Sequence, residues 1–110
     1  MNRFNEYRIT WVMVLFDLPT ESKKEKKAYS CFRKALLKGG FTMFQFSIYL
    51  RHCSSIESAE THIYYVQHHL PQKGHVGIVT LTDRQFGQME ILTCRQPVSL
   101  QIPVQQLELF

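Results

Sequence analysis

The chain has 110 residues, of which 45% are hydrophobic, and its formal net charge is +4. This length allows one hydrophobic core but not two, so we expect a single globular domain. The first apolar run is too short to span a membrane, and no membrane partner is predicted. The three cysteines are isolated, which argues against a zinc site or a disulfide framework. The excess of positive charge makes a polyanionic partner plausible.

The first predicted element is a buried strand over residues 9–16, rich in β-branched and aromatic side chains. Asp17 follows it directly, at a strand tip, where α/β folds tend to place ligands and chemistry. Carboxylate oxygens suit Mg²⁺ or Mn²⁺, and one or two carboxylates with substrate phosphates can be enough. Asp17 is therefore a candidate metal ligand and catalytic residue. The alternative is a solvated loop aspartate that caps a turn.

A lysine-rich helix is predicted next. Ser22 and Glu25 have the spacing of a capping box, and Gly39 with Gly40 ends the helix, one of the two glycines in the left-handed conformation. Its buried face should carry Tyr29, Phe32 and Leu36. The helix also carries cations that, together with Arg51, are candidates to contact a phosphate backbone: Lys23, Lys24, Lys26, Lys27, Arg33, Lys34 and Lys38. The alternative is a solvated helix face.

The remaining elements follow the same kind of signal. Residues 41–53 alternate and predict one bent strand or two strands divided near Ser47, with Phe44 and Phe46 on the same face as Ile48 and Leu50. Ser54 and Glu57 predict the capping box of a second helix. Beyond it we expect a strand over 74–82, a turn over 83–87, a strand over 88–94, and an alternating tail of which part can pair as an edge strand. None of the five histidines has metal-ligand spacing.

This order of elements is typical of an α+β fold, a ferredoxin-like α/β sandwich with the pattern βαββαβ and an extra C-terminal strand. Two helices would cover one face of the sheet, and the other face would keep apolar surface. We therefore predict a homodimer built sheet to sheet, in which two copies of Asp17 would face each other if the axis passed near the strand tips. The domain should span residues 1–94, with residues 95–110 as a tail or edge strand that can pack on the partner subunit.

The sequence Q-L-E-L-F over residues 106–110 resembles the short peptide with which bacterial proteins bind the replication sliding clamp. Gln106, Leu107, Leu109 and Phe110 would be its contact residues. Leucine and phenylalanine anchors on an extended tail suit an apolar groove. The alternative is a final strand packed on the protein's own sheet or on its partner's sheet.

Several motifs in order make the chain similar to the family of CRISPR-associated protein two, the small subunit of the spacer-acquisition machinery. They are V-L-F-D-L-P at the first strand, K-K-E-K-K-A-Y in the helix, G-F-T-M-F-Q-F-S-I-Y-L-R, and a long segment that includes L-T-D-R-Q-F-G-Q-M-E. The last of these resembles members found beside type II systems. The resemblance covers residues 9–91.

The resemblance implies a ferredoxin-like homodimer in the bacterial cytoplasm with metal-dependent endonuclease activity, in which Asp17 matches the family's strand-end aspartate. It also implies a scaffold that binds double-stranded DNA and bridges two dimers of the integrase, CRISPR-associated protein one. Many members carry paired arginines where this chain has lysines, which keep the charge but lose bidentate phosphate geometry. One alternative is that nuclease activity is dispensable for integration. Another is a free-standing, toxin-like ribonuclease that acts on single-stranded RNA.

Overall fold

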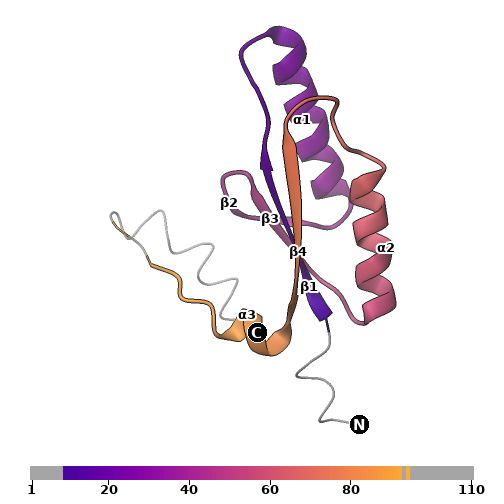
Figure 1. Cartoon of the computed structure of the whole chain (residues 1–110), viewed down its shortest axis with the longest axis vertical. Coiled ribbons are helices and arrows are strands. Elements are labelled where there is room, and N and C mark those ends of the chain that lie inside the picture. Colours follow the sequence, from indigo (N-terminus) through magenta and orange to yellow (C-terminus); the bar gives the residue numbers. More distant parts are fainter. Residues whose placement is uncertain (1–8, 93, 95–110) are drawn as a thin grey trace.

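The computed structural model describes residues 9–92 and residue 94 (Figure 1). In chain order the elements are β1 (Ile9–Asp17), α1 (Lys23–Lys38), β2 (Thr42–Gln45), β3 (Ile48–His52), α2 (Ile56–Gln67), β4 (His75–Thr82) and α3 (Asp83–Gly87). The four strands form one sheet in the order β2-β3-β1-β4, and all neighbours are antiparallel. The pattern βαββαβ confirms the predicted α+β, ferredoxin-like fold.

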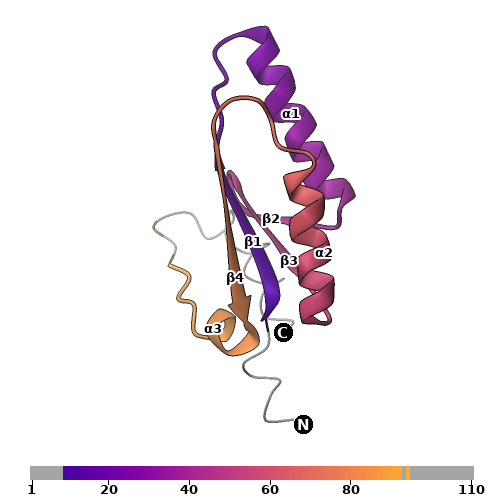
Figure 2. The ribbon, with the colours of Figure 1, turned by 45° about the vertical axis from the view of Figure 1, so that its right-hand side comes forward.

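The two long helices lie on one side of the sheet (Figure 2). The alternation of β1 turns Val12, Val14 and Phe16 toward them, and these side chains are buried in the main core. α1 contributes Phe32 and Leu36 to this core, and α2 contributes Ala59 and Val66. The periodic apolar positions of each helix are therefore what attaches it to the sheet.

Both predicted ends of α1 are confirmed. The Ser22 hydroxyl accepts a hydrogen bond from the backbone N–H of Glu25, and the Glu25 carboxylate accepts one from the N–H of Ser22. The second of these bonds is the largest cause of the lowered pKa of Glu25. At the other end, Gly40 has a φ of 89°, and the N–H of Phe41 donates to the carbonyl of Leu36.

The region after α1 is divided into two strands at Ser47, which is one of the two predicted alternatives. Ser47 has a φ of 67°, which reverses the chain between β2 and β3. This turn interrupts the alternation, so the prediction that Phe46 shares a face with Phe44 and Leu50 is wrong. Phe44 and Leu50 pack in one cluster, whereas Phe46 is 80% exposed.

Three other predictions need correction. The N-cap of α2 is Ser55, one residue later than predicted, and its hydroxyl accepts from the N–H of Ser58. Residues 83–87 form helix α3 rather than a turn, because Thr82 and Gln85 complete a capping box of their own. The strand predicted over 88–94 is absent from the described residues of that range. The predictions for residues 95–110, including the edge strand and the clamp-like peptide, lie outside the described residues.

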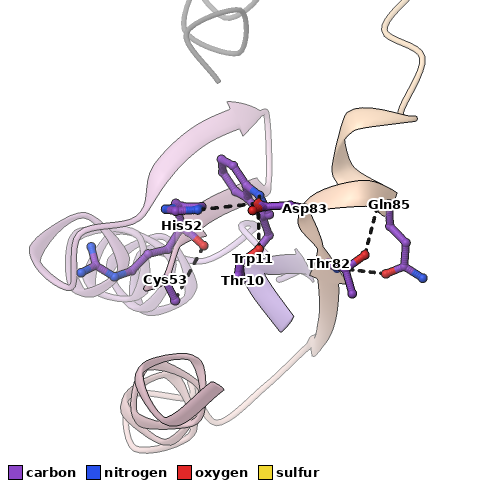
Figure 3. Close-up of polar contacts among 8 residues, drawn as sticks. Thr10, Trp11, His52, Cys53, Thr82, Asp83 and Gln85 are labelled. Carbon is purple, nitrogen blue, oxygen red and sulfur yellow. Dashed lines mark hydrogen bonds and ion pairs between the residues drawn. The ribbon is translucent and has the colours of Figure 1, made fainter. Parts of the chain in front are cut away.

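A second apolar cluster lies on the face of the sheet that is turned away from α1 and α2. Trp11, Leu50 and Phe86 are its buried members, and the Trp11 and Phe86 rings are stacked with their centroids 3.9 Å apart. The Asp83 carboxylate joins α3 to β1, because one of its oxygens accepts hydrogen bonds from Trp11 Nε1 and Thr10 Oγ1, each at 2.8 Å (Figure 3). His52 Nε2 lies 3.7 Å from the same oxygen.

Replacing Asp83 with alanine should lower the free energy of unfolding by about 1–3 kcal/mol, because the acceptor of two partly buried donors is removed. Asp83→Asn, which keeps one side-chain oxygen, should lose less. Urea denaturation followed by Trp11 fluorescence measures both changes, with the exposed Glu60→Ala on α2 as the control. Equal stability of Asp83→Ala and the wild type would contradict this role for Asp83.

Candidate nucleic-acid interface

Asp17 is the last residue of β1, and its side chain is exposed. In the antiparallel pairing of β1 with β4 it stands directly opposite His75, the first residue of β4. Residues that are directly opposite in such a ladder have Cβ atoms about 4.5–5.5 Å apart. The sheet therefore places an imidazole beside the carboxylate at the open end of the strand.

Gly74 holds the loop between α2 and β4 against this strand end. Its φ is 100°, and a Cβ at this position would lie 2.7 Å from the Asp17 carbonyl oxygen and 2.6 Å from Leu18 Cδ2. Only glycine accommodates both the backbone angle and the approach without strain. Sequence reasoning did not connect Gly74 or His75 with Asp17, because the register that brings them together is a property of strand pairing.

The turn between β2 and β3 also reaches the end of β1. The carbonyl of Ser47 accepts a hydrogen bond of 3.1 Å from the N–H of Phe16, the residue before Asp17. Phe46, just before Ser47, places its ring centroid 6.3 Å from that of Tyr29 on α1, with 27° between the ring planes. An aromatic pair therefore lies near the candidate catalytic carboxylate.

The cations predicted on α1 form an exposed surface. All seven are exposed, and in the described part of the chain none of them is in an ion pair. Helical spacing places four of them, Lys23, Lys27, Lys34 and Lys38, on the side of α1 opposite the buried Phe32. Unneutralised cations along one helix give a positive potential that attracts polyanions.

Arg51, the eighth predicted cation, is placed differently. It lies on β3 and is half-buried, and its Nη1 donates a hydrogen bond of 3.1 Å to the carbonyl of Gly40. It therefore braces the connection between α1 and β2, close to Lys38 in the last turn of α1. Its contact with a phosphate backbone stays a prediction.

A cavity of about 370 Å³ lies between α1 and the loop that follows α2. Most of its lining is apolar and includes Leu18, Phe32 and Leu70. Lys24 and Lys73 also line the cavity. Asp17 does not line this cavity. The candidate chemistry thus lies on an open surface, which suits a polymeric substrate better than a small enclosed one.

Asp17 supplies a single carboxylate per chain. Within residues 9–92 and 94, no group of three or more histidine, cysteine, aspartate and glutamate side chains is placed to hold a metal ion. A hard divalent cation can be bound through one or two carboxylates completed by waters and substrate phosphates. The exposed carboxylate of Asp17 fits such a site when a second carboxylate or a phosphate group completes it.

Cys53 and His62 have the residue types of a cysteine nucleophile and its general base, but their geometry argues against nucleophilic catalysis. Cys53 Sγ lies 3.9 Å from His62 Nδ1, but the same nitrogen is 2.7 Å from the carbonyl oxygen of Ser58. Burial raises the pKa of the Cys53 thiol, which keeps it protonated. The pair therefore belongs to the core.

No helix in the described residues is long and apolar enough to cross a membrane.

The fold and this surface define a small ferredoxin-like domain with an exposed aspartate at a strand end and a basic helix that follows it in the chain. The family model for CRISPR associated protein Cas2 matches residues 10–89, and the chain belongs to this family. It is 53% identical to a CRISPR-associated endoribonuclease Cas2 of Flavobacterium psychrophilum, over 98% of this chain and 94% of that protein. Its identity to the protein of the same name from Parvibaculum lavamentivorans is 49%, over 91% of this chain and 99% of the relative. The family predicted from the ordered motifs is confirmed.

Proposed function

We propose that this protein is a CRISPR-associated endonuclease that cuts phosphodiester bonds in RNA, with Asp17 as its metal-binding catalytic residue. The observation that carries the proposal is the position of Asp17, which is exposed at the end of a central strand, six residues before a helix that carries seven exposed cations. None of these cations is in an ion pair in the described part of the chain. The name endoribonuclease, borne by relatives at 53% and 49% identity, supports this chemistry.

The acting form that we propose is a homodimer built through the open face of the sheet. The strand register places Leu15, Ile48 and Gly77 in one row across this face, and Met13, Leu50 and Val79 in the next. Leu50 is already buried beside Trp11 and Phe86, so the second row is open mainly at Val79. Val79 is 41% exposed, so its apolar surface is in contact with water. A second sheet packed on this face would bury that surface, which is favourable. Asp17 and His75 form the adjoining row, so a symmetric pairing of this face brings two Asp17 carboxylates toward the axis.

In this dimer the two Asp17 carboxylates would hold Mg²⁺ or Mn²⁺. The bound ion supplies a low-pKa water and neutralises charge on the phosphate. The α1 lysines bind the phosphates on either side of the scissile bond and fix the position of the strand. Gly74 keeps the loop after α2 close to Asp17, which preserves the position of the carboxylate during binding.

The dimer should have a mass near twice the 13.0 kDa of one chain in light scattering after size exclusion. Val79→Lys should shift the mass toward the monomer, because it buries a charge in the interface. Leu37→Lys is a matched control, since Leu37 is 42% exposed on α1 and lies outside the sheet face. A monomeric wild type at micromolar concentration would count against the dimer.

Asp17→Asn should lower the rate of RNA cleavage at least about tenfold, because the amide keeps the size of the side chain but loses its charge for the metal. The assay uses end-labelled RNA and DNA strands with Mg²⁺, with Mn²⁺, and with a chelator. Glu21→Gln, at an exposed acid four residues away, is the control and should cleave normally. Full activity of Asp17→Asn, or cleavage in the presence of the chelator, would contradict the proposal.

A scaffold role is the second candidate, and the seven exposed cations of α1 favour it. In this role the dimer bridges integrase dimers and supports double-stranded DNA, while the integrase performs the chemistry. Integration of a labelled DNA fragment by the purified integrase separates the two candidates. Normal integration with Asp17→Ala favours the scaffold, whereas failure with the dimer and DNA binding intact favours chemistry at Asp17.

DNA binding should weaken steeply with salt and depend little on base sequence, because lysines release counterions without reading bases. The triple variant Lys23→Gln, Lys27→Gln and Lys34→Gln should reduce the slope of log K against log salt by about 0.9 for each phosphate that is no longer neutralised. Lys73→Gln is the control, since Nζ of Lys73 is already 3.9 Å from a Glu25 carboxylate oxygen. Fluorescence anisotropy at several salt concentrations measures the slopes, and equal slopes would contradict binding through α1.

A further inference from the structure

Phe46 is an exposed aromatic ring in a turn that has a fixed geometry. Its side chain is 80% exposed, and it lies with Ser47 between the end of β2 and the start of β3. The positive φ of Ser47 and the hydrogen bond from Phe16 N–H to the Ser47 carbonyl hold the turn in place. The ring is therefore presented to solvent by a rigid support, which lowers the entropy cost of binding to it.

Tyr29 supports this ring from α1. The two ring planes are 27° from parallel, with centroids 6.3 Å apart, and Tyr29 in turn contacts Phe16 in the main core. The cations nearest to Tyr29 by helical spacing are Lys26, three residues before it, and Arg33, four residues after it. Both are exposed and neither is in an ion pair within the described chain.

The aromatic pair and Asp17 lie at the same end of β1. Ser47 contacts the backbone of Phe16, and Asp17 follows directly. The alternation of β1 turns Phe16 toward the helices and Asp17 toward the open face, so the two sites flank the end of the strand. A nucleic-acid strand that passes this end would meet both the aromatic pair and Asp17.

We propose that Phe46, supported by Tyr29, stacks on an unpaired base of a single strand whose backbone is bound by Lys26 and Arg33. This inference rests on the proposed function and adds the residues that select an unpaired segment next to the scissile bond. Aromatic faces flanked by cations are the elements with which proteins bind single strands without sequence preference. In a duplex the bases are stacked on each other, so Phe46 would gain nothing from paired nucleic acid.

The test is the affinity of a short RNA single strand and of the same RNA as a duplex, both measured by anisotropy in an Asp17→Asn background that prevents cleavage. In this background Phe46→Ala and Phe46→Leu should each weaken single-strand binding roughly fivefold or more, the effect typical of removing one stacked aromatic ring. Phe46→Trp should bind at least as tightly as phenylalanine. Duplex binding should be unchanged in all three, as should single-strand binding by the control Leu37→Ala.

Each other outcome overturns the proposal in a way that identifies the fault. If Phe46→Leu binds the single strand as phenylalanine does, the contact is apolar rather than a stacking one. If Phe46→Ala lowers the mass seen in light scattering, Phe46 belongs to an interface between copies of the chain. If all variants bind the single strand equally, the stacking role of Phe46 is contradicted and the proposed function is not affected. If the protein binds neither RNA, both the stacking role and the proposed function are contradicted.

Discussion

The central position of β1 is the constraint on which the rest of the structure depends. β1 is hydrogen-bonded to β3 on one side and to β4 on the other, so its alternation decides what each face of the sheet carries. Val12, Val14 and Phe16 face the two long helices, and Trp11 with Met13 faces away from them. Because the same pairing fixes where β1 ends, it also fixes which residues surround Asp17.

Much of this arrangement could be predicted from local sequence, since capping and alternation are local properties. The Ser22 capping box, the glycine end of α1 and the division near Ser47 all depend on a few adjacent residues. The face of Phe46 could not be predicted in this way, because Phe46 lies in the turn beside Ser47 and so falls outside the alternation that Phe44 and Leu50 keep. Although T-D-R-Q carries a capping-box signal, α3 is short, and as a helix it depends on Phe86 packing against Trp11.

Some residues of the candidate site could also be predicted from the sequence, and others could not. Asp17 and the α1 cations can be found from the sequence because strand ends and charge runs are visible in one chain, and the structure places all of them at the surface. His75, Gly74 and the Phe46–Tyr29 pair come from other segments, and only strand register and turn geometry bring them together. Ordered motifs identified the family, whereas the surroundings of Asp17 required three-dimensional pairing.

The placement of α3 has a consequence for symmetry. α3 and its Asp83 contacts cover the open face beside Trp11 and Leu50, toward the end of β1 opposite Asp17 (Figure 2). Two sheets that approach each other through this face would meet an obstacle at one end and flat apolar rows at the other. In such a dimer α3 would limit how far one sheet can slide over the other. A short helix far from the candidate chemistry would then determine the separation of the two aspartates.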